Sequence, residues 1–299
     1  MDRDAVNLQG QEESCMDIIC QNQLTECQKK QVQQLEELCA KEEGLKNRAF
    51  LSNELSFDKS LPCFYLAYDE EQLVSFLSVF IPTRQEAEVS AYTHPQHRRK
   101  GYFNTLLQKA QAVLGQAGVP KLLFVAEPQS KSAAGVLWHR NCRHIDRTEY
   151  TMEYTGPIPT VDGLVCLEPL SEQNKAQAVA ISSAVFGMEE GEDNFIENTL
   201  KDPARKGFLA KMEEDAIGIF SLHFEASRVY LYGLGLLECY RGKGYGKNLV
   251  LLALRQAFAN VETKTVVLDV DSQNPPALAL YRGVGFTTIF QADYYTELL

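Results

Sequence analysis

The spacing of apolar residues changes between two periods along this chain, and these changes indicate where elements begin and end. Val32, Leu35, Leu38 and Cys39 recur at helical spacing after Thr25, a residue that can cap a helix. Short apolar runs between turn residues indicate strands. In the first half we expect a helix at 26–43, strands at 64–68, 73–81 and 87–93, a helix from 101 to about 117, a strand at 122–126, a short helix around Trp138 and a strand at 148–154.

The second half repeats this order of elements. Leu249, Leu252, Ala253 and Ala257 form the inner face of its longest expected helix. The expected elements are a strand at 165–168, helices at 173–186 and 195–200, strands at 208–212, 216–225 and 228–237, a helix at 244–260, a strand at 265–271, a short helix around Tyr281 and a last strand ending near Tyr295.

Related residues recur at one long spacing in the two halves. The sequence from Arg98 to Tyr102 returns, partly changed, from Arg241 to Tyr245, 143 positions later, and Trp138 and Tyr281 are separated by the same distance. Such a spacing indicates a duplicated domain. We expect a polar extension at 1–23, one domain at 24–155, a Pro- and Gly-containing linker at 156–160 and a second domain at 161–299.

Composition narrows the class of protein. The chain has 299 residues, of which 45% are apolar and 23% charged, with a net charge of −11. An acidic chain without a basic tract repels phosphate backbones and attracts small cationic amines, so we expect no nucleic-acid partner. The chain starts with a polar stretch and has no apolar run of membrane-spanning length, which predicts a cytoplasmic protein without a membrane partner. The pair His94 and His97 lacks further ligands at metal-binding spacing, so no metal is expected.

A glycine-rich loop between a strand and a helix carries the first sign of chemistry. It runs Arg241-Gly242-Lys243-Gly244-Tyr245-Gly246-Lys247. Backbone N–H groups at a helix N-terminus bind anions, and glycines let a phosphate approach them closely. The loop lacks the Ser or Thr of an ATP-binding P-loop, and its GxGxG spacing differs from the dinucleotide fingerprint. A turn without any ligand is the alternative interpretation of this motif alone.

Together with residues downstream, this loop resembles the signature of the GNAT superfamily of N-acetyltransferases, Q/R-x-x-G-x-G/A. Asn274, Ala277, Leu280-Tyr281 and Gly285-Phe286 match the family's Asn-x-x-Ala-x-x-Leu-Tyr-x-x-x-Gly-Phe pattern. The match covers roughly the last 75 residues. The resemblance implies an α/β fold of two tandem GNAT-like domains, each a mixed, mostly antiparallel sheet flanked by helices. Tandem copies occur in the superfamily, and mycothiol synthase has a similar layout.

The resemblance also implies where acetyl-CoA, the family's acyl donor, is held. The amides from Gly242 to Lys247, with the positive charges around them, would hold the pyrophosphate. The backbone of Leu234, Gly235 and Leu236, on a strand that separates from its neighbour in the family, would follow the pantetheine arm and polarise the acetyl carbonyl. Asn274 would line the pantetheine, and Tyr281 would lie beside the sulfur.

Acetyl transfer to an amine requires a neutral amine, a polarised carbonyl and a proton for the leaving thiolate. An alkylamine has a pKa near 10.4, so a base or a water relay must remove its proton. Asp269 matches an acidic residue that some ribosomal-protein-type members use as the base, although a solvated acid near a strand end is the alternative. Tyr281 is a phenol that can protonate the thiolate, and core packing is its alternative role.

The first copy departs from this pattern. It keeps Arg98 and Gly101 but has Phe103 where the second glycine or alanine belongs. At the spacing of 143, Trp138, Ala126 and Lys131 replace Tyr281, Asp269 and Asn274. Indole cannot protonate a thiolate, so we expect the first copy to be structural or to shape the substrate site.

These observations predict an enzyme that transfers an acetyl group from acetyl-CoA to a primary amine of a small molecule or peptide. The acidic run from Glu189 to Asp193 would either attract the ammonium group or only cap the next helix and be solvated. A non-catalytic CoA-binding sensor or interaction module is the alternative function. The loop matches neither the ATP-binding P-loop nor the dinucleotide fingerprint, which argues against an enzyme dependent on ATP or NAD.

Overall fold

The computed structural model describes residues 16–161, 163, 165–187 and 194–299. By its internal contacts the chain divides into two compact units. Unit 1 comprises residues 1–146 and 292–299, and unit 2 comprises residues 147–291. Each unit contains strands and helices in nearly the same order, so the two are described one after the other.

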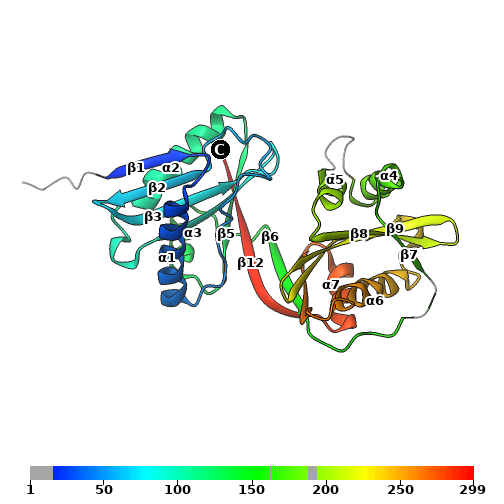
Figure 1. Ribbon diagram of the computed structural model, residues 1–299. Helices are drawn as coiled ribbons and strands as arrows, with labels where there is room; N and C mark the ends of the chain where they lie inside the picture. The colour runs from blue at the N-terminus through cyan, green and yellow to red at the C-terminus, as the bar shows by residue number, and fades with distance from the viewer. Residues whose placement is uncertain (1–15, 162, 164, 188–193) are drawn as a thin grey trace, which may run out of the picture. The chain divides into compact units, whose positions relative to one another are not determined.

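Unit 1 is a six-stranded sheet flanked by helices (Figure 1). Its elements are β1 (Asp17–Gln21), α1 (Glu26–Glu43), β2 (Phe64–Asp69), β3 (Gln72–Phe80), β4 (Ala87–Thr93), a short 3₁₀ turn (Pro95–His97), α2 (Tyr102–Gln116), β5 (Lys121–Ala126), α3 (Lys131–His139) and the last residues of β12 (Thr287–Leu298). The strand order is β1-β2-β3-β4-β5-β12. All neighbours run antiparallel except β4 and β5, which run parallel.

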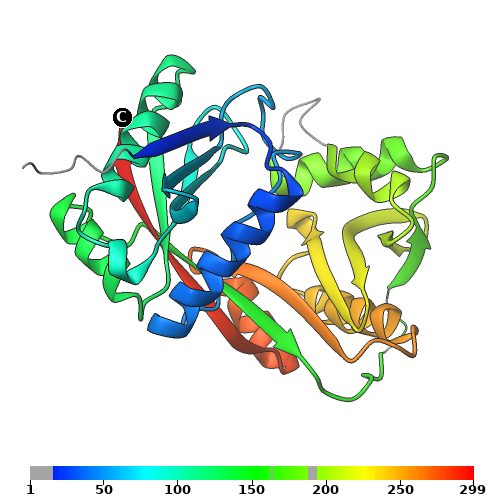
Figure 2. The same cartoon turned by 60° about the vertical axis from the view of Figure 1, so that its left-hand side comes forward.

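Unit 2 repeats this sheet. Its elements are β6 (Arg147–Tyr154), β7 (Cys166–Pro169), α4 (Lys175–Phe186), α5 (Asn194–Lys201), β8 (Arg205–Met212), β9 (Asp215–Glu225), β10 (Arg228–Leu236), a short 3₁₀ turn (Glu238–Tyr240), α6 (Tyr245–Phe258), β11 (Thr265–Asp271), α7 (Pro275–Val284) and the first residues of β12. The order β7-β8-β9-β10-β11-β6 again has one parallel pair, β10 with β11. In Figure 2, α4 and α5 lie on one face of this sheet and α6 on the other. The predicted fold class is therefore confirmed.

Local chemistry accounts for the bounds of the first helix. The hydroxyl of Thr25 accepts a hydrogen bond from the Gln28 backbone N–H, while the Gln28 side chain accepts one from the Thr25 backbone. This capping box satisfies two N–H groups that would otherwise lack partners. At the other end, Gly44 adopts φ +71° and ends the helix, because a left-handed residue at this point favours glycine.

Each sheet has a helix layer on both faces, so its inward side chains are buried on both sides. In unit 1, Leu106, Leu107 and Ala110 of α2 pack against one face, while Val32 and Leu35 of α1 pack against the other. Full burial of one Leu or Val side chain contributes about 1.5–3 kcal/mol, so these two layers hold the sheet between them.

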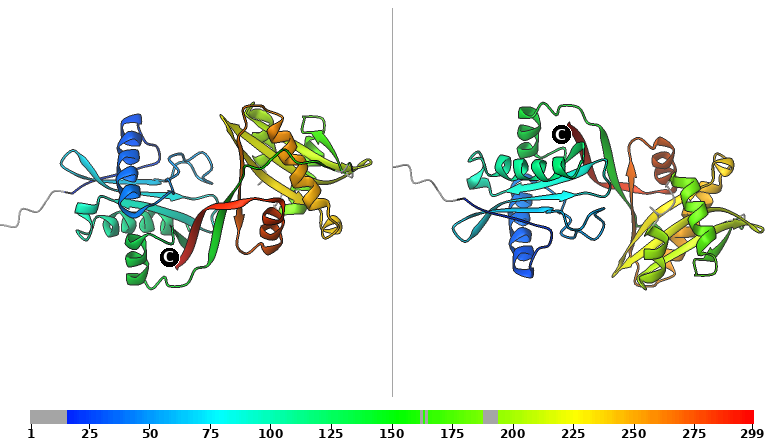
Figure 3. Two further views of the ribbon diagram at one scale, coloured as in Figure 1. Left: turned by 90° about the horizontal axis from the view of Figure 1, so that it is seen from below. Right: turned by 90° about the horizontal axis from the view of Figure 1, so that it is seen from above.

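The strand that completes each sheet is not the one we expected. The sequence predicted that residues 148–154 complete the first copy. Residues 149–154 of β6 pair instead with β11 of unit 2. The sheet of unit 1 is completed by residues 293–298 of β12, which pair with β5, and the C-terminus of the chain lies in unit 1 (Figure 3). The apolar pattern of a strand specifies its inward face but not its neighbour, so the sequence alone did not reveal this exchange.

The N-terminal segment also differs from the expectation. Within the predicted polar extension, residues 17–21 form β1 and pair with β2. Ile18 and Ile19 are adjacent, which gives no alternation, and the strand is held by backbone hydrogen bonds that no side-chain pattern records. In the part of the chain that the structure describes, no helix is long and apolar enough to cross a membrane.

Candidate active site

Strands β10 and β11 separate soon after they begin. They pair only between residues 228–230 and 265–267 in the described structure. Further along, β10 shifts its register against β9 between Tyr232 and Gly235, which marks a bulge. Gly233 within it has φ +58°, and a Cβ there would lie 2.3 Å from the ring of Phe195. The bulge therefore requires glycine, and it lies where β10 has left its parallel neighbour.

The predicted strand residues lie in this bulged segment. Leu234 lines the cavity described below, and Leu236 is buried. A Cβ on Gly235 would lie 2.2 Å from a methyl group of Val185 in α4, so glycine allows this close packing. This bulged segment lies beyond the residues at which β10 pairs with β11.

The glycine-rich loop connects the end of β10 to α6. Gly242 and Gly244 adopt φ +73° and +89°, and a Cβ on either would have no neighbouring atom within 4 Å. Gly244 is the N-cap of α6, and no side chain caps this helix. The side chain of Arg241 donates from Nε to the Leu236 carbonyl at 2.9 Å. The first amides of α6 therefore lack a side-chain cap, and Lys243 and Lys247 add positive charge on either side of Gly244 in the sequence. An uncapped helix N-terminus of this kind binds anions.

The predicted loop residues occupy two parts of this turn. Arg241, Gly242, Lys243 and Gly244 precede the helix, whereas Tyr245, Gly246 and Lys247 form its first turn. The Lys243 ammonium lies 5.9 Å from the centre of the Tyr240 ring. A Cβ on Gly246 would lie 3.4 Å from Leu280, the residue before Tyr281, so the loop packs beside the helix that carries Tyr281.

A cavity of about 200 Å³ opens at the separated ends of β10 and β11. Asp269, Asn274 and Tyr281 all line it, so three of the predicted site residues share one space. The remaining lining residues are Phe186, Leu231, Tyr232, Gly233, Leu234, Val270, Asp271 and Ala277. The sequence predicted none of the aromatic side chains among them, because Phe186 and Tyr232 belong to no motif.

Tyr281 lies on α7 and is 8% exposed. Its ring packs against Phe286, with the ring centres 5.8 Å apart. Burial raises the pKa of the Tyr281 hydroxyl to about 12. The hydroxyl is therefore protonated throughout the neutral range and can act as a hydrogen-bond and proton donor.

Asp269 lies on β11 with its side chain exposed to solvent. Its carboxylate accepts a hydrogen bond of 2.6 Å from the hydroxyl of Thr151, which lies directly opposite on β6. Thr151 comes from the first sequence repeat and reaches this carboxylate through the strand exchange. No sequence motif signals it, because the contact depends on which strand lies beside β11.

Asn274 has a structural role in addition to its place beside the cavity. Its side-chain oxygen caps α7 by accepting a hydrogen bond of 3.2 Å from the Ala277 N–H. Ser130 caps α3 of unit 1 in the same way, through the Ala133 N–H. The two helices therefore correspond at a spacing of 144, one more than the spacing of the loops.

This correspondence corrects the predicted counterparts in unit 1. Ser130, not Lys131, corresponds to Asn274, and buried Leu137, not Trp138, corresponds to Tyr281. Trp138 is 62% exposed, with the Arg143 guanidinium 3.9 Å from its ring centre. Ala126 and Asp269 are 143 positions apart, but Ser130 follows Ala126 by four positions and Asn274 follows Asp269 by five, which the constant spacing of motifs concealed. Leucine cannot donate a proton, so unit 1 still lacks a phenol at the position of Tyr281.

Unit 1 nevertheless contains a larger cavity, of about 750 Å³. It lies at the separated ends of β4 and β5, which pair only between residues 87–89 and 122–124. Phe103 and Leu137 are among its lining residues. The size of a cavity does not supply chemistry. The unit 1 cavity is lined by acids, amides and phenols of its own, but none of them stands at the positions that correspond to Asp269, Asn274 and Tyr281. The acidic run from Glu189 to Asp193 lies outside the described residues.

The model of the acetyltransferase (GNAT) family matches residues 29–137 and 176–286. The chain belongs to this family, and it contains two copies of the family's domain. Among solved structures, a GCN5-related N-acetyltransferase from Sphaerobacter thermophilus covers 94% of this chain and 95% of its own, with a TM-score of 0.75 and 15% identity. A tandem GNAT protein from the clavulanic acid biosynthesis pathway covers 95% and 98%, with a TM-score of 0.70 and 15% identity. These structures share the fold.

Among curated relatives, mycothiol acetyltransferases match over both copies. The Streptomyces coelicolor protein is 26% identical over 212 residues, which span 65% of this chain and 66% of that protein, just under two thirds of its length. The Saccharomonospora viridis protein is 24% identical over 279 residues, which span 83% and 87%. The chain is thus a tandem member of the acetyltransferase (GNAT) family that resembles mycothiol acetyltransferases.

Proposed function

We propose that unit 2 binds acetyl-CoA and transfers its acetyl group to a primary amine of a small molecule or a peptide. The observation that carries this proposal is the cavity where Asp269, Asn274 and Tyr281 meet beside the bulge of β10. The open helix N-terminus at Gly244 provides a site for the pyrophosphate next to it. No P-loop Ser or Thr follows Lys247, so ATP lacks its usual magnesium ligand here.

The chemistry follows from the placement of the three groups. Asp269 accepts a proton from the incoming ammonium group, directly or through water, and its hydrogen bond with Thr151 fixes the carboxylate. A backbone N–H near Leu236 polarises the acetyl carbonyl. The amine nitrogen bonds to the carbonyl carbon, the C–S bond breaks and Tyr281 donates its proton to the leaving sulfur. The second proton lost by the nitrogen returns to the phenol through water as the amide forms.

The lining of the cavity supports a cationic acceptor. Phe186, Asp269 and Asp271 line this space together, so an aromatic residue and two acids surround it. Aromatic faces and carboxylates both attract an ammonium group. The net charge of −11 adds a weak attraction at longer range.

An acceptor panel tests the proposal. Thiol release from acetyl-CoA would be followed with primary amines, peptides with free amino groups, alcohols and carboxylic acids. We expect release only with amines, and mass spectrometry should show the acetylated amine. CoA should also raise the unfolding temperature, because at a hundredfold excess over Kd it stabilises the folded protein by about 2.7 kcal/mol. ATP should not raise the unfolding temperature. Stabilisation by ATP without any by CoA would contradict the proposed cofactor.

A further inference from the structure

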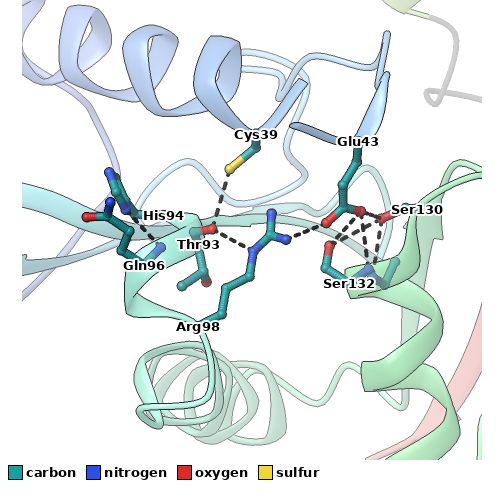
Figure 4. Close-up of polar contacts among 9 residues, drawn as sticks. Cys39, Glu43, Thr93, His94, Gln96, Arg98, Ser130 and Ser132 are labelled. Atoms are coloured by element: carbon teal, nitrogen blue, oxygen red, sulfur yellow. Dashed lines mark hydrogen bonds and ion pairs between the residues drawn. The ribbon is translucent and has the colours of Figure 1, made fainter. Parts of the chain in front are cut away.

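A buried carboxylate crosses the open end of the strand pair β4–β5 in unit 1 (Figure 4). Glu43, the last residue of α1, has a side chain that is 6% exposed. Its Oε1 lies 2.5 Å from Nη1 of Arg98, which follows β4. Its Oε2 accepts hydrogen bonds from the Ser130 hydroxyl at 2.9 Å and from the N–H and hydroxyl of Ser132 at 3.2 and 3.1 Å, all at the start of α3.

These contacts join the two walls of the gap. Arg98 belongs to the wall formed by β4, because its Nε also donates to the Thr93 carbonyl at 3.2 Å. Ser130 and Ser132 belong to the wall that continues from β5 into α3. α1 packs on one face of the sheet and α3 on the other, so the Glu43 side chain passes through the gap between the strands.

Unit 2 contains the same scaffold without this carboxylate. α1 and α4 both end at a left-handed glycine, Gly44 with φ +71° and Gly187 with φ +70°, so Glu43 corresponds to Phe186. Arg241 holds the Leu236 carbonyl as Arg98 holds that of Thr93. In the described part of the chain, Arg241 makes no ion pair, and Phe186 lines the cavity instead of crossing it.

We propose that Glu43 closes the strand gap of unit 1 to an acyl-CoA, so that one residue of α1 decides which copy of the domain accepts the cofactor. This inference rests on the proposed function, because the cofactor groove of unit 2 is the template for the gap in unit 1. Ser130, the counterpart of Asn274, is already engaged by Glu43, and the two walls are tied together where a pantetheine arm would pass.

The electrostatics of Glu43 make this closure stable at neutral pH. Burial by itself would raise the pKa of this carboxyl, but hydrogen bonds from Ser132 and Ser130 and the charge of Arg98 outweigh burial and lower it. The carboxylate therefore stays ionised at neutral pH. Because the pKa of Glu43 is lower in the folded state, the carboxylate stabilises the fold at pH values above its unfolded-state pKa. This stabilisation is lost as the pH falls through the folded-state pKa.

Isothermal titration of the full chain with CoA tests this inference. We expect the wild type to bind one CoA and Glu43→Ala to bind two, because the variant removes the carboxylate and leaves the walls free. Glu42→Ala is the matched control, since Glu42 lines the same cavity and is exposed, but lies outside the network. It should bind one CoA, and both variants should acetylate at the wild-type rate.

The two proposals fail in different ways. The role of Glu43 would be overturned if the wild type bound two CoA molecules and Gly244→Val still bound one of them. It would also be overturned if a folded Glu43→Ala bound only one CoA. A wild-type protein that bound no CoA would contradict the cofactor site of unit 2. If Glu43→Ala then bound one CoA, that result would still support the role of Glu43. If Glu43→Ala does not fold, Glu43→Gln keeps the shape without the charge, and an unchanged stoichiometry there would also overturn it.

Discussion

At the scale of single residues, the hydroxyl of Tyr281 is the group whose loss should separate chemistry from binding. Tyr281→Phe keeps the ring against Phe286 and removes the proton donor. We expect turnover to fall by about 10²–10⁴-fold, while the KM for acetyl-CoA stays near that of the wild type. Steady-state kinetics with a saturating amine provides the measurement. A variant with the wild-type rate would show that another group protonates the sulfur.

The pH dependence gives a second test of the same hydroxyl. Burial raises the pKa of Tyr281 to about 12, so the protonated, donating form is fully present below that pH and is lost only as the pH approaches it. The ratio of the wild-type rate to the Tyr281→Phe rate should stay constant between about pH 7 and 10. A ratio that falls as the pH passes a value near 8 would contradict a buried, protonated donor.

Thr151 is a positioning residue for the proposed base. Thr151→Val removes the hydroxyl that holds Asp269 and keeps the branched shape on β6. We expect kcat to fall about tenfold, since a hydrogen bond to a charged group contributes about 1.5 kcal/mol or more. The KM for acetyl-CoA should not change, and Thr151→Ser should restore the rate. Wild-type kcat in Thr151→Val would remove Thr151 from the mechanism.

At the scale of elements, the exchanged strand β12 is tied into unit 1 by a partly buried ion pair. Glu297 on β12 pairs bidentately with Arg140 at the end of α3 and accepts a hydrogen bond of 2.8 Å from Gln111. Glu297→Gln should lower the free energy of unfolding by about 2–3 kcal/mol, somewhat less than for a fully buried pair because 18% of the Glu297 side chain is exposed.

Chemical denaturation provides this measurement, and an exposed acid provides the control. The Glu225 side chain is 53% exposed, so Glu225→Gln should change the free energy of unfolding by less than about 0.5 kcal/mol. Equal effects of the two substitutions would show that the ion pair does not hold β12 in place.

Local patterns predicted the elements well because each element depends on its own residues. Except for β1, the strands, the helices and the capping residue Thr25 follow from periodicity and from residues at element ends. The exchange of β6 and β12 did not follow, because both strands carry an inward apolar face that fits either sheet. The same limit applies to the site: motifs gave Asp269, Asn274 and Tyr281, which meet at one cavity, but Thr151, Phe186 and Tyr232 reach it only through the fold.

At the scale of the whole molecule, duplication has produced two similar sheets with different contents. Unit 1 has the larger cavity but has Leu137, Phe103 and the ionised Glu43 where unit 2 has Tyr281, Gly246 and Phe186. β4 also pairs with β3 in an unbroken register, whereas β10 bulges away from β9. We therefore assign acetyl transfer to unit 2 and a supporting role to unit 1.

Two matched glycines test this assignment most directly. Gly101 and Gly244 are the N-caps of α2 and α6, with φ +92° and +89°, and a Cβ on either has open space within 4 Å. Valine at either position should cost a similar backbone strain, of order 1–3 kcal/mol, so thermal unfolding should shift alike in the two variants. Only at Gly244 would the new side chain project into the proposed pyrophosphate site.

The rate of acetyl transfer in these two variants, each shown to be folded by circular dichroism, is the decisive measurement. We expect Gly244→Val to lose a hundredfold or more of the wild-type rate, about the cost of misplacing a reacting group by 1 Å, and Gly101→Val to keep the wild-type rate. Loss of activity in a folded Gly101→Val, with activity retained in Gly244→Val, would place the active site in unit 1 and contradict the account.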